Sequence, residues 1–224
     1  QRQMCIRDSY SAIAAANMAL NAIEEKGNPA SLDPQRGEAL VCRAYCHFML
    51  ANIFCNAYDT HASQSLGVPY MEEVETTVSP RYERGTLEEV YRKVERDLLE
   101  GIDLISDDSY SVPKYHFTRK AAYAFAARFY LYYMKPDFSN CDRVIDFATR
   151  VLGTNPADLL RNWEALGNLS VNGNVQADAY IASSNEANLL ISSTVSNWGA
   201  IGSDYLIGPR YFHNQTPVSY THLR

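Results

Sequence analysis

Apolar residues recur at three- and four-residue spacing in five segments of the chain, a period typical of helices with one buried face. The predicted helices cover residues 9–26, 33–58, 86–106, 118–134 and 140–152. Residues that favour helix ends flank several of them: Gly27 and Gly153 follow two helices, and Pro136 follows a third. Thr86, with Glu89 three residues later, predicts a capping box. The pattern therefore predicts a mainly α-helical protein.

One predicted helix, residues 33–58, is apolar around nearly its whole circumference. A helix that is apolar on both faces must be covered on both faces, so we expect it inside a helical layer. Arg43 lies within it, and Arg128 lies in the fourth predicted helix. We expect both to pair with a carboxylate such as Glu38, or with carbonyl groups at a helix end, rather than to bind a ligand.

Two of the predicted helices are similar to each other at an offset of 85 residues. The matched positions are Ala39, Arg43, Tyr45 and Met49 with Ala124, Arg128, Tyr130 and Met134. Residues 140–156 (NCDRVIDFATRVLGTNP) resemble the second helix of a tetratricopeptide repeat, including the closing Asn-Pro. We therefore predict tetratricopeptide-like helix pairs, an α-α superhelix, over residues 10–156.

The regular pattern ends after residue 156, where Asn, Ser and Gly become frequent. Residues 187–195 (ANLLISSTV) predict a strand. We expect residues 157–216 to be the start of an irregular, partly β, ligand-binding part. Within the helical part, residues 59–80 show little helical period and predict a long loop. Long structured loops in compact domains are often functional.

Both ends of the chain have unusual sequences. Residues 1–9 (QRQMCIRDS) and 217–224 (PVSYTHLR) resemble translated sequencing-adapter tails, and we expect neither to be native. The chain would then be an internal fragment, with any secretion signal or lipid anchor outside it. No stretch reaches the roughly 18 to 20 consecutive apolar residues that span a bilayer.

The composition is that of an ordinary folded protein, with 46% hydrophobic and 21% charged residues. The net charge of -6 and the scattered basic residues disfavour nucleic acid as a partner. Tyrosine is abundant, with 16 residues against 8 Phe and 2 Trp. Its flat ring and hydroxyl suit carbohydrate contacts, and they equally suit helices whose rings end at the water boundary.

The sequence offers little catalytic chemistry. Its five histidines are far apart, and it contains no HExxH, GxSxG, P-loop, GxGxxG or CxxC motif. Adjacent acids such as Glu72-Glu73 and Asp107-Asp108 could in principle hydrolyse a glycoside, but such pairs are usually solvated charge. We expect the four cysteines after Cys5 to be free. The chain should therefore be no enzyme, and should use no metal or cofactor.

Sugar binding requires flat aromatic faces for the ring and amide or carboxylate groups for its hydroxyls. Asn197-Trp198 is the leading candidate because it follows the predicted strand and begins a glycine-rich loop. Core packing is the alternative for every candidate. The further candidates are Trp163, Tyr205 and Tyr211, together with Tyr58 and Tyr70 near the 59–80 loop.

A family resemblance runs over about residues 10–200. The segments that carry it are residues 37–54 (GEALVCRAYCHFMLANIF), 67–70 (GVPY), 84–91 (RGTLEEVY), 97–99 (DLL), 118–122 (TRKAA), 127–128 (AR) and 130–132 (YLY). In this order and spacing they resemble SusD/RagB-like proteins.

The resemblance implies tetratricopeptide-like helix pairs that support an irregular ligand-binding part. It implies lipid anchoring at the outer surface of a Gram-negative outer membrane, where such proteins cover a SusC-like TonB-dependent transporter and help to import oligosaccharides without catalysis. The anchor would lie outside this fragment. The alternatives are a tetratricopeptide-type adaptor that binds other proteins and, less favoured, an all-helical glycoside hydrolase.

Overall fold

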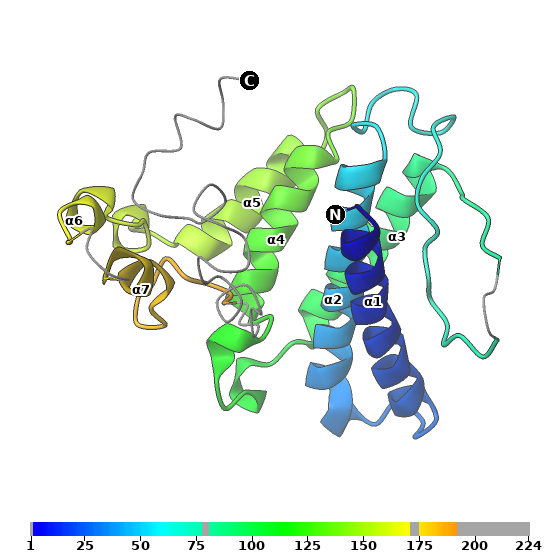
Figure 1. Ribbon diagram of the computed structural model, residues 1–224, viewed down its shortest axis with the longest axis horizontal. Coiled ribbons are helices and arrows are strands. Elements are labelled where there is room, and N and C mark those ends of the chain that lie inside the picture. The colour runs from blue at the N-terminus through cyan, green and yellow to red at the C-terminus, as the bar shows by residue number, and fades with distance from the viewer. Residues whose placement is uncertain (1, 78–80, 171–174, 192–224) are drawn as a thin grey trace, which may run out of the picture. The chain divides into compact units, whose positions relative to one another are not determined.

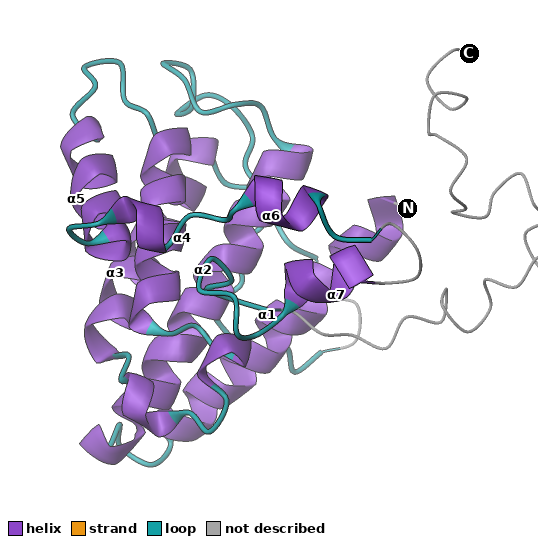
Figure 2. Ribbon diagram, turned by 90° about the vertical axis from the view of Figure 1, so that its left-hand side faces the viewer, coloured by secondary structure: helices purple, strands orange, loops and turns teal. Residues whose placement is uncertain are grey.

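The computed structural model of the protein describes residues 2–77, 81–170 and 175–191. They belong to one unit, residues 1–191, whose fold is mainly α-helical as predicted (Figure 1). Its α-helices are α1 (Arg2–Glu24), α2 (Asp33–Phe54), α3 (Leu87–Leu104), α4 (Arg119–Tyr132), α5 (Cys141–Leu152), α6 (Trp163–Gly167) and α7 (Val175–Ile181). Loops and short 3-10 helices connect them (Figure 2).

Helix α2 lies between α1 and α3, in contact with both. The turn after α1 uses two left-handed residues, Gly27 at φ 80° and Asn28 at φ 51°, which reverse the chain within a few residues. Leu40, Val41 and Leu50 of α2, which point in different directions around the helix, are almost completely buried. The apolar circumference of this helix is thus covered on more than one side, as the sequence predicts.

Two glycines bring the backbones of α2 and α3 close together. A Cβ atom placed on Gly37 would lie 2.7 Å from the carbonyl oxygen of Gly101, and one on Gly101 would lie 2.7 Å from that of Gly37. Real side chains do not tolerate such distances, so both positions require glycine at this helix crossing.

Helices α4 and α5 form a second antiparallel pair. Thr118 caps α4, because its hydroxyl oxygen accepts a hydrogen bond from the Ala121 N–H at 3.2 Å. The rings of Tyr130 and Phe147 stack between the two helices with centroids 5.8 Å apart.

An aromatic cluster joins this pair to α2 and α3. It consists of Phe48, Tyr91, Phe125, Phe129 and Tyr133, which we call the aromatic seam. Phe48 of α2 lies 6.3 Å from the ring of Tyr91 on α3, and 5.6 Å and 5.8 Å from those of Phe125 and Phe129 on α4. All five rings are buried, so the helix pairs share one core.

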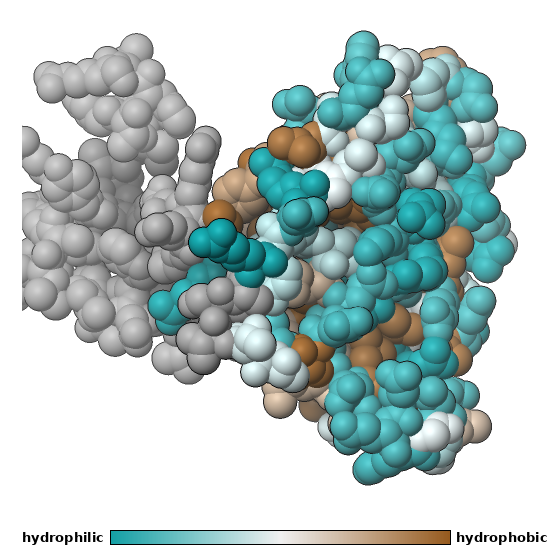
Figure 3. Space-filling view, turned by 90° about the vertical axis from the view of Figure 1, so that its right-hand side faces the viewer, coloured by the Kyte–Doolittle hydropathy of each residue, from teal (hydrophilic) through white to brown (hydrophobic). Residues whose placement is uncertain are grey.

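The segment between α2 and α3, residues 55–86, is longer than the predicted loop. A β-bridge pairs Leu66, in the middle of this segment, with Thr86 at its end. Next to it, the Gly67 N–H donates to the Gly85 carbonyl oxygen at 2.8 Å. The face of the unit that carries this segment is mostly hydrophilic (Figure 3).

Some predicted boundaries are wrong. Helix α1 begins at Arg2 rather than at residue 9, and α2 ends at Phe54 rather than at 58. Residues 187–191, the described part of the predicted strand 187–195, form no strand. The reason is local: the Asn185 side-chain oxygen accepts from the Ala187 N–H at 3.0 Å and turns the chain at the point where the strand should begin.

Candidate ligand-binding site

Trp163 is the predicted site residue that lies on the surface of the described structure. Its side chain is 66% exposed. The Asn162 side-chain oxygen accepts a hydrogen bond from the Ala165 N–H at 2.8 Å, which caps α6 and makes Trp163 its first residue. An exposed indole on a capped helix end is available to a ligand.

Tyr180 of α7 lies beside Trp163, since α6 and α7 contact each other (Figures 1 and 2). The ring centroids are 6.2 Å apart and the ring planes are inclined by 37°. The guanidinium carbon of Arg161 is 4.0 Å from the Tyr180 ring centroid and 5.6 Å from that of Trp163. Cation–π attraction therefore holds the cation against both rings. We call Arg161, Trp163 and Tyr180 the Trp163 cluster.

Asn188 forms hydrogen bonds that hold the Arg161 side chain and the backbone at Tyr180 and Ala182 in place. Its amide nitrogen donates to the carbonyl oxygens of Tyr180 at 2.8 Å and Ala182 at 2.9 Å. Its amide oxygen accepts from Arg161 Nη2 at 2.6 Å, and Arg161 Nη1 donates to the Tyr180 carbonyl oxygen at 3.0 Å. The rings are therefore held by hydrogen bonds and not only by their own stacking.

Lys114 connects this region to the helical part. Its ammonium group donates to the Asn185 carbonyl oxygen at 3.0 Å, and its own carbonyl oxygen accepts from the Ile191 N–H at 2.7 Å. The sequence indicates Trp163 as a candidate site residue, but it does not indicate its neighbours Arg161, Tyr180 and Asn188. For Arg161 the sequence offers one signal, its position two residues before Trp163. Tyr180 and Asn188 give none, because turns rather than a helical period bring them close to Trp163.

The other predicted aromatic residues have different surroundings. Tyr58 is half-buried with its ring 4.9 Å from Tyr91 and 4.8 Å from Tyr133. Tyr70 stacks on His47 at 3.8 Å and donates to Asp97 Oδ2 at 2.7 Å. Burial, together with the negative charge of Asp97, raises the pKa of Tyr70 far above its usual range. A ligand role for both tyrosines remains a prediction.

Trp198, Asn197, Tyr205 and Tyr211 lie outside the described residues. Their predicted roles are untested by the geometry.

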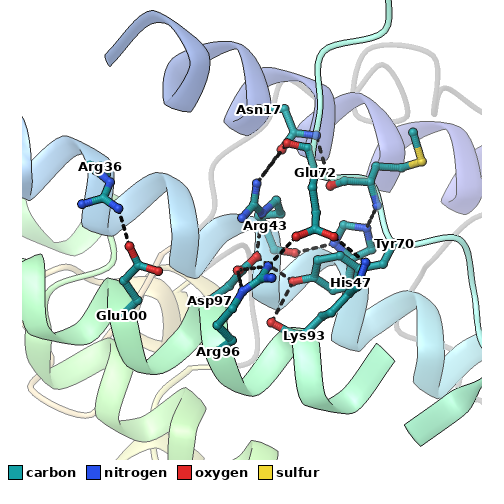
Figure 4. Close-up of polar contacts among 11 residues, drawn as sticks. Asn17, Arg36, Arg43, His47, Tyr70, Glu72, Lys93, Arg96, Asp97 and Glu100 are labelled. Carbon is teal, nitrogen blue, oxygen red and sulfur yellow. Dashed lines mark hydrogen bonds and ion pairs between the residues drawn. The ribbon is translucent and has the colours of Figure 1, made fainter. Parts of the chain in front are cut away.

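Asp97 is the centre of a buried polar network between α1, α2 and α3 (Figure 4). Arg43 Nε donates to Asp97 Oδ2 at 2.6 Å, and Arg43 Nη1 donates to Asn17 Oδ1 at 3.1 Å. The structural pairing predicted for Arg43 is confirmed, but Glu38 is the wrong partner. Glu38 instead contacts His116 Nδ1 at 2.9 Å. A separation of five residues places Arg43 and Glu38 on different faces of the helix.

His47 attaches the segment after Pro69 to α2. Its Nε2 atom accepts from the Met71 N–H at 3.0 Å, so Nδ1 carries the hydrogen that is donated to the Arg43 carbonyl oxygen at 2.9 Å. Burial lowers the pKa of His47 to about 4. Asn17 of α1 holds the same segment by donating to the carbonyl oxygens of Met71 and Glu73.

A polar cleft of about 750 Å³ lies above this network. Several of its lining side chains form ion pairs with one another: Arg36 with Glu100, and Arg96 with Glu72 and Asp97. Although partial burial opposes it, hydrogen bonds from Lys93 and Arg96 lower the pKa of Glu72. Among the described residues, the lining of this cleft includes no aromatic side chain, so the cleft offers no ring on which a sugar could stack.

Within the described ranges, no group of three or more His, Cys, Asp or Glu residues is arranged to hold a metal ion. Among the same residues, no helix is both long and apolar enough to cross a membrane. Cys42, Cys46, Cys55 and Cys141 are free, and burial raises the pKa of the Cys42 thiol to about 12.

Residues 4–131 match the model of a SusD-like family described as starch-binding associating with outer membrane. This match covers more than half of the chain. The chain belongs to the SusD-like family. No curated protein sequence matches it.

Solved structures of the SusD superfamily share its fold. One from Bacteroides thetaiotaomicron is 24% identical, with a TM-score of 0.59 over 71% of this chain and 34% of that chain. A SusD-like carbohydrate binding protein from Bacteroides vulgatus is 18% identical, with a TM-score of 0.59 over 73% and 33%. Another Bacteroides vulgatus protein is 22% identical, with a TM-score of 0.58 over 88% and 44%. The chain thus spans less than half of the length of these proteins.

Proposed function

We propose that this SusD-like chain binds glycans without transforming them, and that it delivers oligosaccharides to a SusC-like TonB-dependent transporter. Its place would be the outer surface of the outer membrane, to which a lipid anchor would attach it. Support comes from its family, which is described as starch-binding and outer-membrane-associated.

The exposed Trp163–Tyr180 pair is the observation that supports a specific sugar-binding site. An aromatic face packs against the apolar C–H face of a sugar ring, while polar groups at the edge take its hydroxyls. Trp163 presents its exposed indole, and Arg161 supplies N–H donors beside it. Because hydrogen bonds fix this frame before a ligand arrives, little ordering is required on binding.

The position of the cluster agrees with the proposed division of the chain. Residues 10–156 would be the helical support and 157–216 the start of the ligand-binding part, with 1–9 and 217–224 as non-native tails. Helices α6 and α7 span only Trp163–Gly167 and Val175–Ile181. Such short helices do not continue a tetratricopeptide array, which disfavours the adaptor alternative.

The experiment is a glycan-array screen of the chain, followed by calorimetric titration of the strongest ligand. We expect Trp163→Ala to weaken binding about tenfold, because one stacked ring is lost. Phe138→Ala is the matched control, since Phe138 is also an exposed aromatic residue, at 67%. Unchanged affinity in Trp163→Ala would remove the site from the proposal, and absence of binding to every glycan would contradict the function.

A further inference from the structure

Arg161 has unused hydrogen-bonding capacity. A guanidinium group carries five N–H donors in one plane. Two of its hydrogen bonds go to neutral acceptors, the Tyr180 carbonyl oxygen at 3.0 Å and Asn188 Oδ1 at 2.6 Å. In the part of the chain that the structure describes, Arg161 forms no ion pair with an Asp or Glu side chain within 4.0 Å. Its positive charge is therefore not neutralised by any acidic side chain that the structure describes.

Besides Asp158, whose side chain lies outside the described structure, three acidic residues lie near Arg161 in the sequence or the fold: Glu164, Asp178 and Glu186. Glu186 lies 4.0 Å from the ammonium group of Lys114 and is 73% exposed. None of the three forms an ion pair with Arg161. Their charges reduce the local positive potential, so the attraction of this site for an anion depends on direct contact with the guanidinium group and should be modest.

The contacts of Arg161 also fix its direction. Its guanidinium carbon stacks 4.0 Å from the Tyr180 ring centroid, and Asn188 holds Nη2. The same carbon is 5.6 Å from the centroid of the Trp163 ring. The guanidinium group therefore lies close enough to the indole for one saccharide ligand to contact both.

We infer that the Trp163 cluster prefers a saccharide that carries a carboxylate, a uronic acid. The sugar ring packs on Trp163, and its carboxylate accepts hydrogen bonds from the unused N–H groups of Arg161. A carboxylate matches the planar geometry of guanidinium better than a hydroxyl does, and charge-assisted hydrogen bonds are stronger than neutral ones. This inference rests on the proposed function and names the class of ligand at its site.

The test compares one ligand with and without its charge. The chain is titrated calorimetrically with trigalacturonic acid and with its methyl ester, which has the same sugar rings but no carboxylate. We expect the acid to bind roughly fivefold more tightly at low salt, and this preference to shrink at high salt because the pair is partly exposed.

Variants separate charge from stacking. Arg161→Gln should bind the acid and the ester equally, whereas Arg161→Lys should keep part of the preference. Trp163→Ala should weaken both ligands in the same proportion. Circular dichroism of each variant checks that the helical fold is retained.

Equal affinity of the chain for acid and ester would overturn the inference and leave glycan binding intact. An undiminished preference in Arg161→Gln, or no binding of either uronide, would overturn it as well. The proposed function fails separately, when the wider glycan screen finds no ligand at all.

Discussion

The hydrogen bonds of the buried His47 side chain depend on its protonation state. Both ring nitrogens are engaged in the neutral form, one as acceptor and one as donor. Protonation of Nε2 would place an N–H against the Met71 N–H, and burial already penalises the charged ring. The pKa of His47 is accordingly lowered to about 4, from 6.5 in an open chain.

This lowered pKa predicts acid sensitivity. The unfolded chain binds the proton more readily, so the contribution of His47 is complete above pH 6.5 and is lost as pH falls toward 4. Between pH 8 and pH 5 we expect a loss on the order of 2 kcal/mol in the free energy of unfolding. His47→Gln should lose less over this interval in urea unfolding, because glutamine does not titrate. Equal losses in both proteins would refute the assignment.

For a single residue, the sequence predicts the kind of interaction better than it predicts the partner residue. A lone arginine in an apolar helix predicts a buried ion pair, and Arg43 forms one. The partner, Asp97, comes from another helix, and no local pattern connects the two. The nearer acid, Glu38, was the wrong choice because its side chain leaves the helix on a different face.

The start of α3 was predictable because capping is local chemistry, whereas the start of α1 and the end of α2 were predicted wrongly. The capping box of α3 is confirmed: the Thr86 hydroxyl oxygen accepts from the Glu89 N–H at 3.2 Å, and Glu89 Oε2 accepts from the Thr86 N–H at 2.9 Å. The predicted strand 187–195 rested on side-chain preferences alone. Residues 187–191 form no strand, because the side chain of Asn185 turns the chain before them.

The capping box predicts a measurable loss of stability. Thr86→Ala should lower the free energy of unfolding by about 1 kcal/mol, because the Glu89 N–H at the start of α3 loses the hydroxyl oxygen that accepts from it. Thr86→Ser is the matched control and should retain most of it. Chemical denaturation followed by far-ultraviolet circular dichroism measures the difference, and a loss as large in the serine variant would contradict the hydroxyl's role.

At the scale of the whole molecule, the aromatic seam makes the helix pairs share one core. Phe48 is 1% exposed and touches rings from both α3 and α4. Its burial was predictable from the all-round apolar pattern of α2, but its partners were not, since they depend on how the pairs pack. The same limit applies to the ligand site: Trp163 could be predicted, whereas Tyr180 and Asn188 reach it only through the tertiary fold.

Substitution of Phe48 should therefore reduce stability more than substitution of an exposed aromatic residue. We expect Phe48→Ala to destabilise the chain by about 3–5 kcal/mol, from lost burial and the cavity left behind. Phe138→Ala, which removes a 67% exposed ring, should change stability by less than about 0.5 kcal/mol. Urea denaturation compares the two, and similar midpoints would argue against a shared core.

The contact between Gly37 and Gly101 also governs a surface to which neither residue contributes. Arg36 and Glu100, their immediate neighbours in sequence, line the polar cleft and form an ion pair across it, while both glycines are absent from the lining. A Cβ atom on either glycine would lie 2.7 Å from the carbonyl oxygen of the other, so the two helices are closer here than a larger residue would permit. The glycine pair thus sets the spacing of α2 and α3 beside the cleft, and a larger residue at either position would move Arg36 and Glu100 apart without itself lining the cleft.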